Sequence, residues 1–244
     1  MAGVKRKRSY RRPVKRARKS TYRSMSQPSR RLKSNPFKSE LRWLDRALDE
    51  TAVAFGVSGS NASPATNLCL NSMVQGNGSS ERDGSKIQMR SLDINGTILS
   101  KGNVDTDKLN PIDVVVAVVC AKTNNNVATV PLGTHIFDDT LFANHSHQAF
   151  RNLEETKNYS VLYKKRFTIN HDQEFAGVNW HASPKQVSFS KHINLKGMVV
   201  NFKGNTGNLS DIVDNALHVY VWCDNIVQSV QPYISYQSRL RFVG

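Results

Sequence analysis

Apolar and polar residues alternate with a period of two along much of the chain from residue 51 onward, whereas helical periodicity is scarce there. Alternation of this kind, interrupted by turns rich in Gly, Asn and Ser, predicts a succession of β-strands. Residues 112–120 are β-branched and nearly continuous in hydrophobicity, which predicts a central strand buried on both faces. The predicted strands are residues 51–57, 67–74, 86–99, 112–120, 159–169, 187–202, 217–222 and 233–243.

Some segments need a more specific interpretation. Residues 86–99 are long enough for one bent strand with Asn95-Gly96 as a bulge or kink. Residues 187–202 are predicted to form two short strands divided at Lys196-Gly197. Residues 40–48 fit a helix behind a serine N-cap and fit a strand equally well, so both interpretations stay open.

The order of these segments favours one fold class. About eight or nine strands with uneven loops, no β-α-β alternation and no Rossmann glycine pattern indicate an all-β protein. We predict an eight-stranded antiparallel jelly roll, with two four-stranded sheets packed face to face. Residues 131–157 form a long insertion, which we expect to be a surface or inter-subunit loop containing a short helical turn near residues 151–155.

Charge divides the chain into two parts. Residues 1–39 hold 15 of the 34 Lys and Arg residues and no Asp or Glu, which leaves 19 basic residues to match the 19 acidic ones in residues 40–244. The first part therefore carries the whole net charge of +15, and it has too few apolar residues to fold alone. We predict a disordered Arg- and Lys-rich arm over residues 1–39 and a single jelly-roll domain over residues 40–244.

The arm is predicted to bind nucleic acid. A basic tail condenses on phosphates and gains free energy by releasing counterions, and arginine suits bidentate phosphate contacts. No recognition helix, zinc finger or RNP pattern is present, so we expect little sequence preference. The same clusters fit a nuclear import signal bound by an import receptor, and the third alternative is a solubilising tail. The predicted contact residues are Lys5, Arg6, Lys7, Arg8, Arg11, Arg12, Lys15, Arg16, Arg18, Lys19, Arg23, Arg30, Arg31 and Lys33.

A second basic group lies within a predicted strand. Lys164, Lys165 and Arg166 are consecutive, so their side chains alternate between the two faces of the sheet. They are candidates for nucleic-acid contact on an inner surface, or alternatively belong to an exposed strand face.

Metal and redox chemistry have little support in the sequence. Three dispersed cysteines without C-x-x-C spacing predict reduced, packed thiols. The pair His145 and His147 lacks the following acid of a cupin motif and lies in a predicted loop. The acidic pairs Asp138-Asp139 and Asp211/Asp214 are expected to be solvated, with Ca²⁺ binding at a subunit contact as the alternative. We therefore predict no metal site and no cofactor.

Other function classes are also disfavoured. No nucleophile elbow or phosphate-binding loop is present, so we predict that the protein is not an enzyme. The basic N-terminus is not followed by an apolar segment, which predicts no secretory signal. No run of about 18 apolar residues occurs, so we expect no membrane partner.

Several short motifs, in order along the chain, resemble the small single-jelly-roll coat proteins of viruses. Residues 238–242, Ser-Arg-Leu-Arg-Phe, resemble the C-terminal strand of coat proteins from circular single-stranded DNA viruses that encode a replication initiator. The other segments are similar to those proteins and to the coat protein of satellite tobacco necrosis virus. They are residues 75–76, 82–87, 92–97, 151–153, 159–169, 193–197 and 200–202.

This resemblance implies a structural protein of the virion. It implies a T=1 icosahedral shell of about 60 identical subunits, with the arms directed inward onto a packaged genome. The nuclear-type arm and the C-terminal strand favour circular single-stranded DNA over RNA, and favour the host nucleus as the site of assembly. The alternatives are a cellular nucleic-acid-binding protein of ribosomal or chromatin type and a jelly-roll enzyme of the cupin kind.

Overall fold

The alternating segments of the chain pair into two sheets that enclose one main core. The computed structural model describes residues 40–59, 69–100, 111–124, 130–138, 146–170, 173–176, 179–182, 185–224 and 232–244. These residues belong to one compact unit, Ser39–Gly244. The predicted arm, with all of its predicted contact residues, lies outside the described residues.

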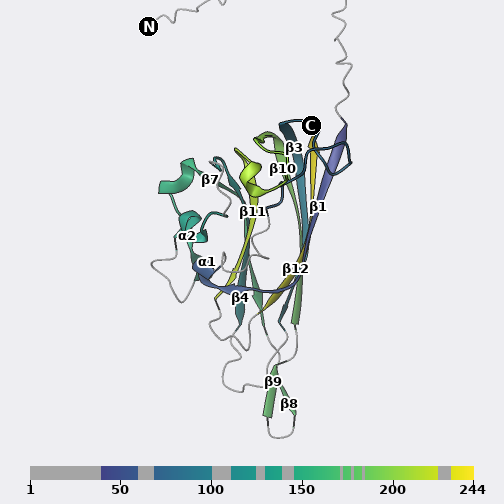
Figure 1. Cartoon of the computed structure of the whole chain (residues 1–244). Coiled ribbons are helices and arrows are strands. Elements are labelled where there is room, and N and C mark those ends of the chain that lie inside the picture. Colours follow the sequence, from purple (N-terminus) through teal and green to yellow (C-terminus); the bar gives the residue numbers. More distant parts are fainter. Residues whose placement is uncertain are drawn as a thin grey trace, which may run out of the picture. The chain divides into compact units, whose positions relative to one another are not determined.

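The two main sheets have four strands each. Their strand orders are β1–β12–β3–β10 and β2–β11–β4–β7 (Figure 1). Pairing within them is antiparallel except for the two-residue strand β2, which runs parallel to β11. The first strand thus lies beside the last, as in a jelly roll, and the predicted fold class is confirmed. The strands are β1 (Leu41–Ala52), β2 (Ala54–Phe55), β3 (Lys86–Ser100), β4 (Ile112–Ala121), β7 (Tyr159–Ile169), β10 (Lys185–Asn201), β11 (Ala216–Cys223) and β12 (Tyr233–Val243).

Short elements occupy the connections. The insertion at residues 131–157 holds five of them, including the predicted helical turn, which lies at η2. No helix in the described residues is long and apolar enough to span a membrane. The short elements are α1 (Gly56–Gly59), α2 (Gly133–Ile136), β5 (Phe137–Asp138), η1 (Ser146–Gln148), β6 (Phe150–Arg151), η2 (Glu154–Lys157), β8 (Gln173–Ala176), β9 (Asn179–Ala182) and η3 (Leu209–Asp211).

The segment that fitted both a helix and a strand is strand β1. Arg42 and Leu44 are buried, whereas Trp43 and Asp45 between and beyond them are exposed. This period of two places alternate side chains on opposite faces, as a strand requires. The outward side chains of β1 are exposed, as are Gln237 and Arg239 on the neighbouring strand β12.

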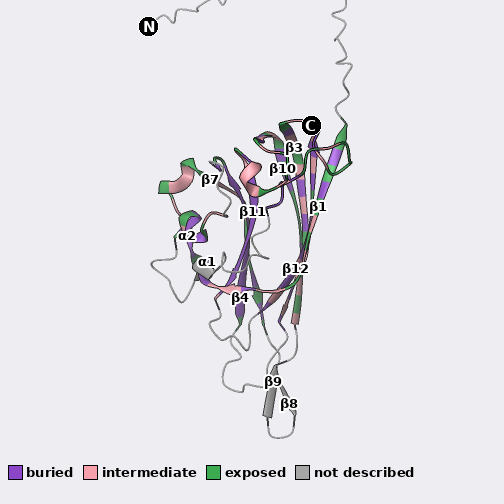
Figure 2. Ribbon diagram, in the orientation of Figure 1, coloured by how far each residue is buried: buried purple, intermediate pink, exposed green. Residues whose placement is uncertain are grey.

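Strands β4 and β11 are buried on both faces, as predicted for residues 112–120 (Figure 2). Their inward side chains join the main core between the sheets. Their outward side chains join a second cluster, in which Tyr220 and Trp222 of β11 pack with Ile136, Phe137 and Ala149 of the insertion. The insertion therefore covers the outward face of one sheet, and this cover removes the exposed side that an alternating strand normally has.

The predicted kink at Asn95-Gly96 is wrong. Strand β3 pairs without interruption there, and Gly96 faces Phe189 on one side and Tyr236 on the other. A Cβ atom on Gly96 would lie 2.5 Å from the Phe189 ring and 2.7 Å from the carbonyl oxygen of Ser235. The glycine thus permits a close approach between strands rather than a bend.

The irregularity in β3 lies earlier, at Arg90. Phe242 pairs with Met89 and Arg241 pairs with Ser91, so Arg90 is the extra residue of a bulge.

Three other strand predictions need correction. The expected division of residues 187–202 into two strands is wrong, because one strand, β10, runs through Lys196 and Gly197, which make a bulge with positive φ angles of 54° and 76°. Phe202 lies beyond the end of β10 and forms an isolated bridge with Ile212. Residues 51–57 are divided between β1, β2 and α1. In the described part of residues 67–74, pairing is limited to isolated bridges at Cys69 and Val74.

Candidate nucleic-acid interface

The outward face of the β1–β12–β3–β10 sheet is open to solvent and polar. Its strands are in register, so their outward side chains form rows across the sheet. One row runs Asp45–Arg239–Asp93–His192, with negative and basic side chains alternating from strand to strand. A hollow of about 730 Å³ lies at this row and is lined in part by Asp45, Asp93, Arg239 and Arg241.

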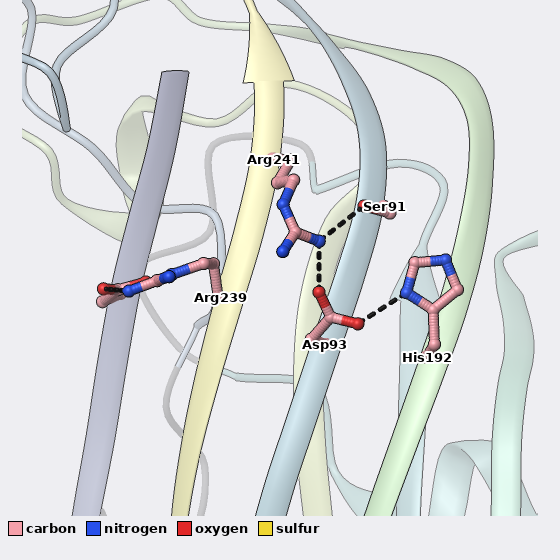
Figure 3. A network of polar contacts seen from close by, with 6 residues as sticks. Ser91, Asp93, His192, Arg239 and Arg241 are labelled. Carbon is pink, nitrogen blue, oxygen red and sulfur yellow. Dashed lines mark hydrogen bonds and ion pairs between the residues drawn. The ribbon is translucent and has the colours of Figure 1, made fainter. Parts of the chain in front are cut away.

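Ion pairs hold the two arginines of strand β12 flat against this face (Figure 3). Arg239 donates from Nε and Nη2 to the two carboxylate oxygens of Asp45, each at 2.7 Å. Arg241 donates from Nη1 to Asp93 and, at 3.4 Å, to Ser91 Oγ. Asp93 Oδ1 lies 2.5 Å from His192 Nδ1, so the network reaches β10.

The pKa shifts agree with this pairing. The hydrogen bond from Arg239 lowers the pKa of Asp45. Burial raises the pKa of Asp93, but hydrogen bonds from His192 and Arg241 outweigh burial, so the net shift is downward. Both carboxylates are therefore ionised at neutral pH, and the row carries pairs of opposite charge rather than a concentration of positive charge.

The basic group predicted on strand β7 is divided by the structure. Lys164 is exposed as a residue, yet its ammonium donates to the carbonyl oxygen of Ala149 and lies 5.1 Å from the ring centre of Phe137 and 5.7 Å from that of Trp222. Burial of the ammonium lowers the pKa of Lys164. Lys164 is thus bound to the insertion that covers the sheet.

The other two members of that group point elsewhere. Lys165 lies on the opposite face of β7, with Nζ 4.8 Å from the ring centre of Phe167. Arg166 is exposed and its Nε lies 3.4 Å from Asp113 Oδ1. The three cations therefore do not form one surface, although each retains partial access to solvent.

The loop carboxylates considered for calcium have protein partners. Asp211 accepts hydrogen bonds from the Thr206 amide and hydroxyl, each at 2.7 Å, and from the Gly207 amide at 2.9 Å. Asp214 accepts from the Asn201 amide at 2.7 Å. Of the other pair, Asp138 ends β5, whereas Asp139 lies outside the described residues. Asp211 therefore stabilises the loop at residues 206–211, and Asp214 binds the end of β10.

One group has the composition of a metal site. Possible ligand atoms of Asp113, His147 and Asp224 lie within 4.8 Å of one another. However, His147 Nε2 faces Asp113 Oδ2 at 3.6 Å, whereas Nδ1 faces Asp224 Oδ2 at 3.3 Å. The two carboxylates face two different ring nitrogens, whereas a metal ion needs one nitrogen and both carboxylates directed at one point. We interpret the group as a set of polar contacts that joins η1 to the ends of β4 and β11.

Comparison with models of known protein families shows which family contains this chain. The geminivirus coat protein/nuclear export factor BR1 family matches residues 2–243. The chain belongs to this family. A search of curated proteins finds no match. The expected resemblance to coat proteins of circular single-stranded DNA viruses is confirmed at the level of the family.

Membership in a geminivirus coat protein family agrees with the jelly roll and with a structural role. The family name describes a coat protein and an export factor and no enzyme, which leaves the cupin alternative without support. Sequence reasoning missed Arg239 and Arg241 as surface residues, although it singled out the segment that contains them. Their spacing of two was the available signal, because it places both arginines on one face of a strand. Their partners Asp45 and Asp93 are distant in sequence and had no such signal.

Proposed function

We propose that this protein is a capsid subunit that assembles into a small icosahedral shell and packages single-stranded DNA. About 60 copies in a T=1 arrangement enclose the genome, and the basic arms, residues 1–39, bind it without strong sequence preference. The observation that carries this proposal is the division of charge in a coat-protein family member. The arm holds the whole net charge of +15, and the domain is formally neutral.

Charge arithmetic supports packaging. A shell of about 60 arms presents ~900 positive charges, which by counterion release can condense a single strand of the order of one to two kilobases. A neutral domain also packs against copies of itself without net repulsion. Lys165 and Arg166 are retained as secondary candidates for contact with the genome, whereas the contacts of Lys164 with the insertion favour a structural role.

Negative-stain microscopy of the full-length protein beside a variant lacking residues 1–39 tests the proposal. We expect uniform shells of roughly 20 nm that protect nucleic acid from nuclease, and empty shells from the truncated variant. Shells of both proteins with equal nucleic-acid content would contradict packaging by the arm. Particles of another size would replace the T=1 arrangement while leaving packaging intact.

The second function in the family name, nuclear export, is the alternative. It is favoured by the same arm, because a basic segment that binds DNA and an import receptor also suits a protein that carries DNA through the nuclear envelope. DNA binding without shells at any salt or concentration would support it over the capsid.

We also infer that the cluster at residues 5–8 directs the coat protein to the nucleus for assembly. Replacing Lys5, Arg6, Lys7 and Arg8 with Gln in a fluorescent fusion is expected to leave the protein outside the nucleus.

A further inference from the structure

One end of the open sheet face has a different character from the charged row. Leu41 and Trp43 are 53% and 45% exposed, although both are large and apolar. Both lie on the outward face of β1, the edge strand. Exposed large apolar residues that adjoin one another mark an interaction surface more often than isolated ones do.

The register of the sheet shows what surrounds these two residues. Trp43 pairs with Arg241, which pairs with Ser91, which pairs with Asn194. In the neighbouring row, Leu41 pairs with Val243, followed by Gln88 and Val199. Neither row contains an acidic residue, whereas the next row holds Asp45 and Asp93. Within the rows of the sheet, acidic side chains thus begin one row beyond Trp43, whereas Glu40 and Asp83 near the start of β1 are paired with Arg42.

Cations adjoin the same end of the sheet. Arg90 is exposed at the bulge of β3, and Lys196 is exposed at the bulge of β10. Lys86 is exposed at the start of β3. No ion pair to these three side chains is found within the described part of the chain. Arg90 and Lys86 lie on β3, two strands from β1, and Lys196 lies on β10, three strands from β1. A single strand that crosses the sheet from Trp43 would carry its phosphates past these cations while a base stacks on the ring.

Trp43 is also held firmly in place. Its amide donates to the carbonyl oxygen of Ser79 at 3.3 Å. The preceding residue, Arg42, donates to the carbonyl oxygen of Glu81 at 2.9 Å and pairs with Asp83 at 2.8 Å. The turn at residues 78–83 therefore fastens the beginning of β1, so the exposed ring projects from a rigid strand. A rigid aromatic platform loses little conformational entropy when a base stacks on it.

We propose that Leu41, Trp43, Arg241 and Val243, here named the Trp43 surface, bind the packaged single strand by stacking a base on the indole ring. Arg241, Arg90 and Lys196 contact the neighbouring phosphates. This inference rests on the proposed packaging function and assigns it a second contact site, distinct from the arm. Residue 39, the last of the predicted arm, precedes Leu41 by two positions, so a strand held by the arm is at high effective concentration at this surface.

Nucleic acid fits this surface better than a second copy of the chain does. Protein–protein interfaces are depleted of lysine and bury a mainly apolar centre, whereas three exposed cations adjoin the Trp43 surface. Stacking on tryptophan also accepts any base, which matches the lack of a sequence-reading element in the chain.

The test compares two labelled oligonucleotides of equal charge and of about 20 nucleotides, an oligothymidylate and its abasic counterpart. Fluorescence anisotropy measures their binding to the full-length protein over a range of salt concentrations. The variants are Trp43→Leu, Trp43→Phe and, as a matched control, Phe150→Leu, since Phe150 is 69% exposed on the insertion.

We expect Trp43→Leu to weaken oligothymidylate binding by roughly 5- to 150-fold, since stacking contributes about 1–3 kcal/mol per base. The affinity for the abasic oligonucleotide should not change, and neither should the slope of log affinity against log salt concentration. Both quantities report phosphate contacts. Trp43→Phe should retain most of the discrimination between the oligonucleotides, and Phe150→Leu all of it.

Equal loss for both oligonucleotides, or no loss for either, would overturn the assignment. Normal DNA binding by Trp43→Leu together with failed shell assembly would instead make this surface a contact between copies. If the unsubstituted protein binds neither oligonucleotide, the proposed packaging function fails as a whole, which is a different result from the failure of Trp43 alone.

Discussion

The outward faces of the two sheets differ, although both sheets are built from alternating strands. On the β2–β11–β4–β7 sheet, the insertion covers Tyr220 and Trp222, and both are fully buried. On the β1–β12–β3–β10 sheet, the outward face is open and carries arginine–aspartate pairs and Trp43. One sheet therefore has side chains buried on both faces, whereas the other has one face exposed to solvent.

Replacing one tryptophan on each face with alanine gives the largest expected contrast. Trp222 is fully buried and its ring centre lies 5.0 Å from that of Phe137. We expect Trp222→Ala to lower the free energy of unfolding by about 3–5 kcal/mol, because it leaves a cavity under the insertion. Trp43→Ala should lower it by less than about 1 kcal/mol, since Trp43 is half exposed.

Urea unfolding followed by circular dichroism measures both changes. Similar losses for Trp222→Ala and Trp43→Ala would show that the open face is also covered, for instance by another subunit.

Lowering the pH should destabilise the folded protein through His218. This residue of β11 is fully buried, and neither ring nitrogen has a hydrogen-bond partner. Burial lowers its pKa from 6.5 to about 4. The unfolded chain therefore takes up a proton as the pH falls below 6.5 while the folded chain does not, so stability falls between pH 6.5 and about 4. The loss attributable to His218 is roughly 3 kcal/mol once the pH is below 4.

Comparing the pH dependence of unfolding for the unsubstituted protein and His218→Leu isolates this contribution. Carboxylates titrate in the same pH range, so only the difference in stability between the two proteins reports the contribution of His218. Parallel pH profiles would mean that His218 accepts its proton without cost in the folded protein.

Substitution of Lys164 tests how firmly the insertion at residues 131–157 is attached to the sheet. Lys164→Met removes the hydrogen bond to the Ala149 carbonyl and the contacts with the Phe137 and Trp222 rings. We expect a loss of about 1 kcal/mol, with faster hydrogen exchange in residues 131–157. Lys165→Met is the control, because its ammonium contacts only the Phe167 ring among the described residues. An equal effect of both substitutions would assign the loss to charge rather than to attachment.

The sequence predicted the strands better than it predicted their exposure. Residues 112–120 are continuously apolar, so burial on both faces was visible in the pattern. Residues 217–222 alternate, yet every residue of β11 is buried, because Tyr220 and Trp222 lie beneath an insertion that is distant in sequence. Local periodicity reports the pleat of a strand and carries no information on what covers its second face.

The candidate nucleic-acid interface could likewise be predicted only where a local sequence pattern specifies it. The arm was evident from composition alone, since 39 residues without an acid need no structure to be recognised as polycationic. The separation of Lys164 from Lys165 followed from strand alternation. The pairing of Arg239 with Asp45 and of Arg241 with Asp93 depends on strand register across the sheet, which no local pattern specifies.

The smallest effect is expected from the ion pair between Asp45 and Arg239. Its geometry is bidentate, but both side chains are about half exposed, so water and salt screen the attraction. A double-mutant cycle with Asp45→Asn and Arg239→Gln should give a small favourable coupling at low salt. The coupling should vanish at high salt, because salt screens the attraction. It should also vanish in acid: the pKa of Asp45 is lowered in the folded state, and the pair stops contributing once Asp45 is protonated. A coupling that persists in high salt would require the pair to be buried, which would place another molecule on the open face of the sheet.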